Sequence, residues 1–299
     1  MRTGSVPLAD LAGGFDLQAT LESGQTYLWT REDDATYAAD GARGGDAWYS
    51  TVVDGEVIRV RQRDGLLEWE STTDAESRLF DLLALDDDLP AIREGASDDD
   101  LIRAAYERYW GLRIVRDPFF GCLVSFICSA QMRVGRIFAM QAALREAYGE
   151  TITFDGRTYH AVPTPDALAD ANEDDLRELR LGYRAPYVAR TAELVASGEL
   201  TESDVRGEDL ETTREALKGF VGVGDKVADC VALFSLGHRD AVPLDTWIRT
   251  AIEEYYPDCA RGNYAETSRA IREAFGPKAG YTQTYVFHYL RSGDDVDGS

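Results

Sequence analysis

Apolar and polar residues alternate with a period of two along most of the first seventy or so positions. Tyr27 and Trp29 follow this pattern, and so do Trp48, Ser50 and Val52. Glycine-rich breaks separate the alternating runs. Because successive side chains of a strand point to opposite faces, the pattern predicts an antiparallel sheet of short strands.

The spacing of apolar residues changes to three and four after about residue 75, and this period is typical of helices. It predicts helices over residues 75–85 and 101–110, and an amphipathic helix over 132–148. Residues 117–130 are nearly all apolar after an Asp-Pro start, which predicts a central buried helix. Residues 151–162 are expected to form a short hairpin. Proline or capping signals predict further helices from Pro165, Glu173, Pro186, Asp209, Asp225, Leu244, Tyr264 and Pro277.

These patterns together predict an α+β fold that is mostly helical, with a small N-terminal antiparallel β-sheet subdomain. We expect the β-rich subdomain to occupy residues 1–100 and the helical region residues 101–292. The last residues, 293–299, are expected to form a disordered acidic tail. No repeat and no long linker divides the chain further.

The charge of the chain has the wrong sign for a protein that binds phosphates. Its 299 residues carry 31 basic and 54 acidic side chains, giving a formal charge of −23 at pH 7. Lysine is scarce, and aspartates occur in runs at 86–88 and 98–100. An excess of acidic residues with few lysines is typical of proteins from salt-loving organisms, so we expect a halophilic protein. In molar salt, repulsion between like charges is screened within a few ångströms, and local arginines and backbone amides can then bind phosphate.

Other features of the composition limit the cellular context. No apolar run reaches transmembrane length, and the N-terminus lacks the pattern of a signal peptide. The four cysteines show no paired metal-ligand spacing. We therefore expect a cytoplasmic protein, nucleoid-associated if it is prokaryotic, with neither a metal site nor disulfides and with no membrane partner.

The stretch from 217 to 249 concentrates the candidate chemistry. Gly219, Gly222 and Gly224 separate two helical patterns with a tight turn, which is the signature of a helix-hairpin-helix. The second helix is expected to open at Asp225. Backbone N–H groups and the helix dipole at such a turn form a site for an anion such as a phosphate.

Two residues of this stretch suggest an active site. Lys226 is one of only three lysines, and a lysine amine can attack an electrophilic carbon to form a Schiff base. Asp245 follows Val242-Pro243-Leu244, close to an expected helix start where a carboxylate is easily kept ionised. By position alone, Lys226 also fits a solvated lysine at a helix start. An N-cap role for Asp245 is compatible with a catalytic one.

The sequence GVGDKVADC followed by AVPLD resembles the helix-hairpin-helix glycosylase superfamily, specifically the 8-oxoguanine DNA glycosylases of eukaryotic and archaeal type. Further blocks match in the family's order and span most of the chain: Ser23-Gly24-Gln25, Asp117-Pro118 with SFICSA at 125–130, LGYRAPYV at 181–188, and GYTQTYVF at 280–287. The resemblance implies that residues 101–292 form the helix-hairpin-helix glycosylase region.

The resemblance also implies a reaction. Lys226 matches the family's nucleophile and Asp245 its essential carboxylate. The implied enzyme is a DNA N-glycosylase that removes 8-oxoguanine from duplex DNA after base flipping, with Schiff-base lyase activity at the abasic site. It needs no cofactor, and we expect it to act as a monomer on double-stranded DNA containing an oxidised purine.

Four residues match the family's base pocket. The Gly24 carbonyl would accept a hydrogen bond from N7–H, which oxidised guanine has and guanine lacks. Cys230 and Phe287 would lie on the two faces of the flipped base, and Gln283 on its Watson–Crick edge. Taken without the family, Cys230 and Phe287 are typical core residues, and Gly24 fits an ordinary turn.

Recognition of the opposite base is where the chain departs from the family. Arg136 and Arg184 match the arginines that hold the orphaned cytosine, and Tyr183 matches the wedge tyrosine. The family's asparagine run is replaced by a segment that begins with Gln131, which is expected to fill the same space. The histidine two places after the catalytic aspartate is replaced by Trp247. Cytosine preference is therefore less firmly implied than the identity of the lesion.

Two alternatives remain open. The same scaffold can serve a glycosylase for another damaged purine such as an alkylated base, which would need an electron-rich aromatic pocket for a cationic base and would leave Lys226 unnecessary. The second alternative is a noncatalytic helix-hairpin-helix module that only binds DNA. In that case Lys226→Gln would leave DNA binding unchanged.

Overall fold

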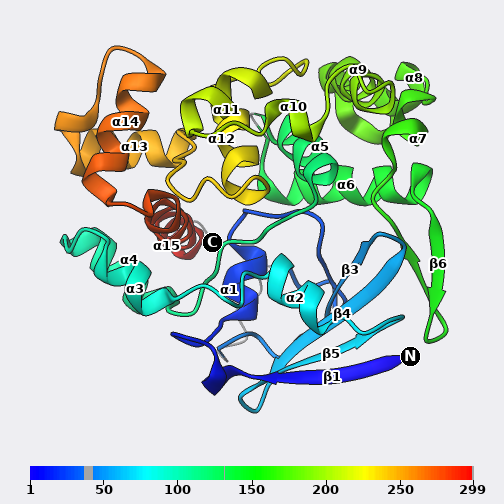
Figure 1. The fold of residues 1–299 in the computed structure, drawn as a ribbon, viewed down its shortest axis with the longest axis horizontal. Helices are drawn as coiled ribbons and strands as arrows, with labels where there is room; N and C mark the ends of the chain where they lie inside the picture. The colour runs from blue at the N-terminus through cyan, green and yellow to red at the C-terminus, as the bar shows by residue number, and fades with distance from the viewer. Residues whose placement is uncertain (37–42, 131, 298–299) are drawn as a thin grey trace.

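A computed structural model describes residues 1–36, 43–130 and 132–297, with side chains to residue 292. It places a twisted sheet below a larger group of helices, with the C-terminal helix between them (Figure 1). The strands are β1 (Arg2–Pro7), β2 (Thr30–Arg31), β3 (Tyr49–Val53), β4 (Glu56–Arg63), β5 (Leu66–Ser71), β6 (Thr151–Phe154) and β7 (Arg157–His160). The helices before the hairpin are α1 (Leu17–Glu22), α2 (Glu76–Leu82), α3 (Leu89–Glu94), α4 (Asp100–Tyr109), α5 (Phe119–Ser129) and α6 (Val134–Tyr148).

The later helices form most of the upper group: α7 (Pro165–Ala169), α8 (Glu173–Leu176), α9 (Ala185–Ala196), α10 (Glu202–Val205), α11 (Leu210–Leu217), α12 (Asp225–Phe234), α13 (Thr246–Tyr255), α14 (Tyr264–Phe275) and α15 (Ala279–Asp297). The helix starts predicted from proline and capping signals agree with these bounds within two residues. Helix α15 extends into the segment 293–299, and residues 298–299 lie outside the described part. The division at residue 100 stays a prediction.

The N-terminal sheet confirms the period-two pattern. It is antiparallel with the strand order β1-β5-β4-β3-β2, and Val60 of β4 lies between Tyr49 of β3 and Trp69 of β5. All three side chains are buried. These three residues form part of one packed face, while Val52 and Val57 on the other face pack with Phe154 of β6.

Three short helices were not predicted, namely α1, α3 and α10. The expectation of strands up to about residue 70 is wrong for α1, whose start is capped by Asp16 through a 2.9 Å bond from the Ala19 N–H. Five of the six residues of α1 are buried. Its sequence, LQATLE, alternates apolar and polar residues with a period of two, so the pattern alone does not distinguish this short helix from a strand.

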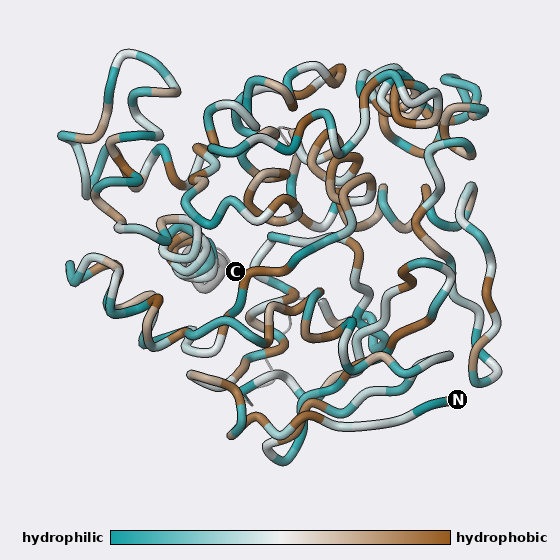
Figure 2. Tube along the Cα trace, in the orientation of Figure 1, coloured by the Kyte–Doolittle hydropathy of each residue, from teal (hydrophilic) through white to brown (hydrophobic). Residues whose placement is uncertain are grey.

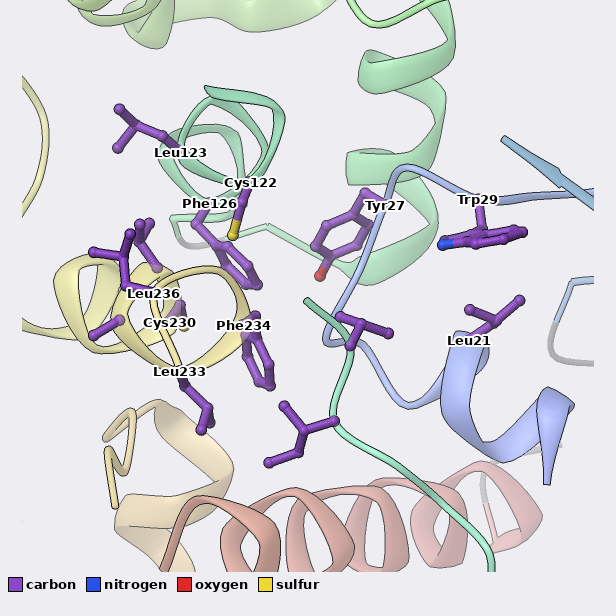
Figure 3. Close-up of a cluster of buried hydrophobic side chains, with 14 of the residues drawn as sticks. Leu21, Tyr27, Trp29, Cys122, Leu123, Phe126, Cys230, Leu233, Phe234 and Leu236 are labelled. Carbon is purple, nitrogen blue, oxygen red and sulfur yellow. The ribbon is translucent and has the colours of Figure 1, made fainter. Parts of the chain in front are cut away.

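Helices α5 and α12 form the centre of the helical group. Every residue of α5 except Phe120 is buried, which confirms the central helix predicted from its composition. Figure 2 shows the concentration of apolar residues on these two helices. Phe126 of α5 stacks on Phe234 of α12 with ring centroids 5.6 Å apart, and Tyr27 meets Phe126 edge-on at 5.9 Å (Figure 3). This packing fixes α12 against the loop that follows α1.

A buried arginine ties the N-terminal segments together. The guanidinium of Arg113 is fully buried and donates to four backbone carbonyls, those of Ala12, Gly14, Ala84 and Asp87, at 2.7–3.2 Å. These carbonyls come from two loops that are far apart in the sequence. The planar fork of arginine fits such an arrangement, because its donors point in fixed and different directions.

Replacing Arg113 by lysine should therefore destabilise the protein by about 3 kcal/mol, because one ammonium group cannot reach all four carbonyls and leaves buried acceptors unsatisfied. Urea unfolding at fixed salt measures this loss. The control Arg63→Lys changes an exposed arginine on β4 and should shift the free energy of unfolding by less than about 0.5 kcal/mol. Equal stability of the Arg113→Lys variant and the native protein would contradict the role given to this residue.

Candidate active site

A cleft of about 1110 Å³ opens between α12, α15, the start of α13 and the loop that follows α1. Most residues singled out in the sequence line it: Gly24, Gly222, Gly224, Lys226, Cys230, Asp245, Gln283 and Phe287. Of the described residues singled out with them, Gly219, Arg136, Tyr183 and Arg184 lie outside its lining, and the call on Gln131 falls outside the described residues. The cleft thus brings together side chains separated by more than 200 positions in the chain.

The hairpin glycines have different roles. Gly222 has a φ of +84°, and a Cβ there would lie 2.6 Å from the Tyr187 ring, so only glycine fits. A Cβ on Gly219 would press against Leu200 at 3.0 Å, whereas one on Gly224 would meet open space. Gly224 directly precedes the first residue of α12. The first N–H groups of α12 are consequently approachable from outside, as an anion site requires.

Lys226 is the second residue of α12 and is half-buried. Its amine donates to the Ser129 hydroxyl at 3.2 Å and lies 5.4 Å from the centre of the Phe126 ring. Both partners belong to α5. The central helix therefore restrains the amine at the wall of the cleft, which disagrees with a freely solvated lysine at a helix start.

Cys230 lies one turn after Lys226 on the same face of α12. Burial raises the pKa of its thiol to about 12, against the opposing charge of Lys226. The side chain is only 3% exposed although it lines the cleft. At neutral pH Cys230 is thus a neutral, apolar wall rather than a thiolate nucleophile.

Asp245 is the N-cap of α13, and its Oδ1 accepts from the Ile248 N–H at 2.9 Å. Burial raises the pKa of this carboxyl above its ordinary value, while that bond and the charge of Lys226 oppose the rise. The N-cap geometry was expected from the sequence. It fixes the carboxylate at the start of a helix and directs it toward the cleft that Lys226 also lines.

A buried polar network supports the segment that carries Asp245. Arg214 donates to both carboxylate oxygens of Asp229, at 2.7 and 3.2 Å, and the Tyr264 hydroxyl donates to Asp229 at 2.8 Å. The same hydroxyl accepts from the Leu244 N–H at 3.1 Å. Asp229 lies next to Cys230, so the network connects the helix of the lysine with the backbone that precedes Asp245.

The opposite wall of the cleft is the loop that holds Gly24. This glycine has a φ of +90°, and a Cβ on it would come within 3.2 Å of the Phe287 ring. Gln25 anchors the loop, because its amide donates to the Arg113 carbonyl at 2.8 Å and accepts from the Val115 N–H at 2.9 Å. Gln283 and Phe287 lie one turn apart on α15. The Gly24 backbone and the Phe287 ring consequently form one continuous surface.

Two residues that line the cleft had no expected role. Ser129 belongs to a block quoted from the sequence, but nothing there indicates that it contacts the lysine. Arg291 lies four residues after Phe287 and is 8% exposed, with its side chain lining the cleft. The spacing alone placed Arg291 on the same face as Phe287, and this was the only signal available.

The residues matched to opposite-base recognition lie beyond the cleft lining. Arg184 is buried, donates to the Ala130 carbonyl, and stacks over the Tyr183 ring with its guanidinium carbon 4.3 Å from the ring centre. Tyr183 is 53% exposed, and Arg136 is exposed on α6. Since Ala130 lines the cleft, Arg184 and Tyr183 are attached to its rim.

The charge of the cleft is opposite to that of the chain. Among the described residues that line it, four side chains are basic and one is acidic. The basic residues are Arg133, Lys226, Arg249 and Arg291, and the acidic residue is Asp245. A local positive field therefore exists in spite of the net charge of −23.

Comparison with known proteins identifies the class. The model of the "HhH-GPD superfamily base excision DNA repair protein" matches residues 124–277, more than half of the chain. The chain therefore belongs to the HhH-GPD superfamily of base excision DNA repair proteins. Residues 9–123 match a second and more particular model, described as "8-oxoguanine DNA glycosylase, N-terminal domain".

Individual relatives agree with this assignment. A probable N-glycosylase/DNA lyase of Methanothermobacter thermautotrophicus is 30% identical over 95% of this chain and 96% of its own length. The structure of MBOgg1 with a low-affinity DNA ligand has a TM-score of 0.86, with 31% identity over 98% of this chain and 96% of that one. The 8-oxoguanine glycosylase/lyase of Clostridium acetobutylicum, bound to duplex DNA with cytosine opposite 8-oxoG, has a TM-score of 0.82, with 28% identity over 94% and 93%. The α+β fold predicted from the sequence is thereby confirmed.

The raised pKa of Asp245 gives a prediction about stability. Its ionisation opposes folding as pH rises from the ordinary aspartate range through the folded pKa, so Asp245→Asn should raise the free energy of unfolding at pH 7. Asparagine also keeps the N-cap. Urea unfolding at pH 7 and near pH 4 tests this, and the gain should shrink at the lower pH.

Asp209 is the matched control, because it caps α11 but its pKa is lowered by the bond from the Thr212 N–H. Its ionised form stabilises the fold above the ordinary pKa, and this contribution is lost as pH falls. Asp209→Asn should consequently lower stability at pH 7. If Asp245→Asn instead lowered the free energy of unfolding at pH 7, this would contradict a raised pKa for the Asp245 carboxyl.

Proposed function

We propose that this protein is an 8-oxoguanine DNA glycosylase with lyase activity at the resulting abasic site, acting in base excision repair. The observation that carries the proposal is the convergence in one cleft of a restrained lysine amine, a half-buried carboxylate and the side chains of Cys230 and Phe287. Two relatives named above support the proposal: one is a probable N-glycosylase/DNA lyase, and the other is an 8-oxoguanine glycosylase/lyase bound to duplex DNA with cytosine opposite 8-oxoG.

The catalytic step uses Lys226 and Asp245. The lesion is first flipped out of the duplex into the cleft. The C1′–N9 bond breaks with oxocarbenium character, the base leaves and takes up a proton, and the Lys226 nitrogen forms a bond to C1′. Asp245 stabilises the developing positive charge and helps the amine to lose its proton.

The lyase step follows from the adduct. The lone pair of the lysine nitrogen then breaks the C1′–O4′ bond, and O4′ takes up a proton, which gives a protonated Schiff base between Lys226 and the opened sugar. This iminium acidifies C2′, so removal of a C2′ proton expels the 3′ phosphate by β-elimination. Water then releases the lysine. The protein supplies the amine of Lys226 and the carboxylate of Asp245, water supplies the final hydrolysis, and the proposal includes no cofactor.

Recognition of the lesion uses the walls of the cleft. The Gly24 carbonyl accepts from N7–H of 8-oxoguanine and would face the N7 lone pair of guanine, which is repulsive. The positive φ of Gly24 and the anchoring of Gln25 support a fixed direction for that carbonyl. Cys230 and Phe287 hold the two faces of the base, and Gln283 binds its Watson–Crick edge.

DNA contacts surround this pocket. The N–H groups at the start of α12, with Gly222 and Gly224 before them, bind a phosphate. Tyr183 enters the base stack as a wedge, while Arg136 and Arg184, with Gln131, hold the orphaned base. The cation–π contact between Arg184 and Tyr183 supports a joint role for these two residues. The basic lining of the cleft supports duplex DNA as the partner.

Borohydride trapping tests the nucleophile. Native protein should form a covalent adduct with duplexes that carry one 8-oxoguanine, placed opposite each of the four bases in turn. Lys226→Gln should reduce trapping by at least about 10³-fold, because the glutamine amide cannot form an imine. Lys278→Gln changes an exposed lysine just before α15 and should trap normally.

The other outcomes are equally informative. Excision without an adduct in the native protein would remove Lys226 as nucleophile and leave a glycosylase without lyase activity. If the native protein gives no excision and no adduct, 8-oxoguanine is refuted as the substrate. That result would favour another damaged purine or a noncatalytic binding module.

The proposal has three further parts, namely a monomeric protein, a cytoplasmic location and adaptation to high salt, and the acidic composition supports the last of them. Mutual repulsion among the excess carboxylates is screened only when the Debye length is short, roughly 4 Å at half-molar salt. Among the described residues that span 1–36, 43–130 and 132–297, no helix is long and apolar enough to cross a membrane.

Far-ultraviolet circular dichroism during dialysis tests the salt adaptation. The folded signal should be lost as salt falls below roughly half-molar, because the carboxylates then repel one another over longer distances. Potassium and sodium chloride should act alike if screening is the cause. A protein that stays folded in dilute buffer would contradict the adaptation.

A further inference from the structure

Arg291 introduces a charge into the wall of the proposed base pocket. It lies on α15, one turn after Phe287, and its side chain is 8% exposed while lining the cleft. Buried arginines in proteins normally satisfy a structural need, and this one donates to the Glu22 carbonyl at 2.5 Å. Its position next to the pocket gives that charge a second consequence.

The guanidinium of Arg291 is adjacent to both sides of the framework that would hold the base. Its carbon lies 5.5 Å from the centre of the Phe287 ring. A Cβ on Gly24 would lie only 3.0 Å from its Nη1. Arg291 thus contacts the loop that supplies the carbonyl and the ring that supplies the stacking surface.

The positive charge of Arg291 influences other groups inside the cleft. The positive charge of Arg291 is among the influences that oppose the rise of the Asp245 pKa, although Asp245 belongs to α13. Lys226 adds a second cation, and Asp245 is the one acidic group among the described lining residues. When a base occupies the cleft and displaces water, like charges repel there more strongly than at the surface.

The aromatic wall is affected as well. A pocket that favours a cationic base needs a ring whose negative face is available to that base. The Phe287 ring already lies within cation–π distance of Arg291. Its capacity to stabilise a second cation is therefore reduced.

From these contacts we propose that Arg291 is a specificity-determining residue that excludes cationic alkylated purines from the pocket. The inference rests on the proposed function and names which substrates the same site rejects. A purine methylated at N7 or N3 carries a positive charge in the nucleoside, whereas 8-oxoguanine is neutral. A cationic base that enters the cleft is repelled by the charges of Arg291 and Lys226, whereas the neutral lesion carries no net charge to be repelled.

Exclusion at entry is needed because the chemistry itself does not discriminate. A cationic purine leaves as a neutral base, so its glycosidic bond breaks more readily than that of 8-oxoguanine. Asp245 would stabilise the same oxocarbenium character in either reaction. A repulsive element against the competing substrate gives selectivity that attractive contacts alone would not give.

Two neutral replacements and one charged replacement test the proposal. Arg291→Gln removes the charge but keeps an amide donor for the Glu22 carbonyl, and Arg291→Met removes both. Arg291→Lys keeps the charge. Single-turnover excision rates are measured on duplexes containing 8-oxoguanine, cationic 7-methylguanine or neutral hypoxanthine, and thermal unfolding verifies that each variant is folded.

The expected result is a rise of about tenfold in the rate ratio of 7-methylguanine to 8-oxoguanine for Arg291→Gln and Arg291→Met. The ratio of hypoxanthine to 8-oxoguanine should change less than threefold. Arg291→Lys should keep both ratios near those of the native protein. Using ratios removes any general loss of activity that follows from disturbing the Gly24 loop.

Three results would overturn the proposal. The first is a rate ratio of 7-methylguanine to 8-oxoguanine that stays unchanged in Arg291→Gln or Arg291→Met while that variant remains folded. The second is an equal rise in both ratios, which would indicate a loosened pocket rather than lost repulsion. The third is an Arg291→Lys variant that behaves like Arg291→Gln. Failure of the proposed function is seen separately, as absence of 8-oxoguanine excision by the native protein.

Discussion

The ion pair between Arg214 and Asp229 is the interaction on which the site depends most. Helix α12 presents Lys226 and Cys230 to the cleft and Asp229 to the interior, where the carboxylate is fully buried. Such a burial is tolerable only with a complete set of partners, and Arg214 and Tyr264 provide them. The same network bonds the backbone before Asp245. The helix with the amine and the segment with the carboxylate therefore share one structural support.

Sequence patterns predicted the regular elements well and their contacts poorly. The sheet, the buried helix α5 and the capped helices follow from periodicity and from capping residues, which act within a few positions. Helix α1 was missed because its six residues, LQATLE, alternate apolar and polar as a strand does. The Arg214 network joins residues up to 54 positions apart, and no local pattern reports such a contact. Family resemblance named the lining of the cleft, but the neighbours Ser129 and Arg291 became visible only in three dimensions.

The distribution of charge explains how an acidic chain can fit a polyanion. The excess carboxylates are spread over the molecule, whereas the lining of the cleft is basic. Net charge governs solubility and long-range association, while the contacts that orient a ligand depend on the nearest groups. The usual inference from net charge to partner fails here because it averages over surfaces with different roles.

The buried thiol of Cys230 has a consequence for the chemical durability of the protein. A repair enzyme for oxidised bases works where oxidants are present, and cysteines are attacked mainly as exposed thiolates. Burial holds Cys230 as a protonated thiol, with its pKa raised to about 12. The sulfur can therefore lie against a purine as a soft, polarisable surface and still resist conversion to a sulfenic acid. The packing of α12 against α5 thereby protects the enzyme from the kind of damage it repairs.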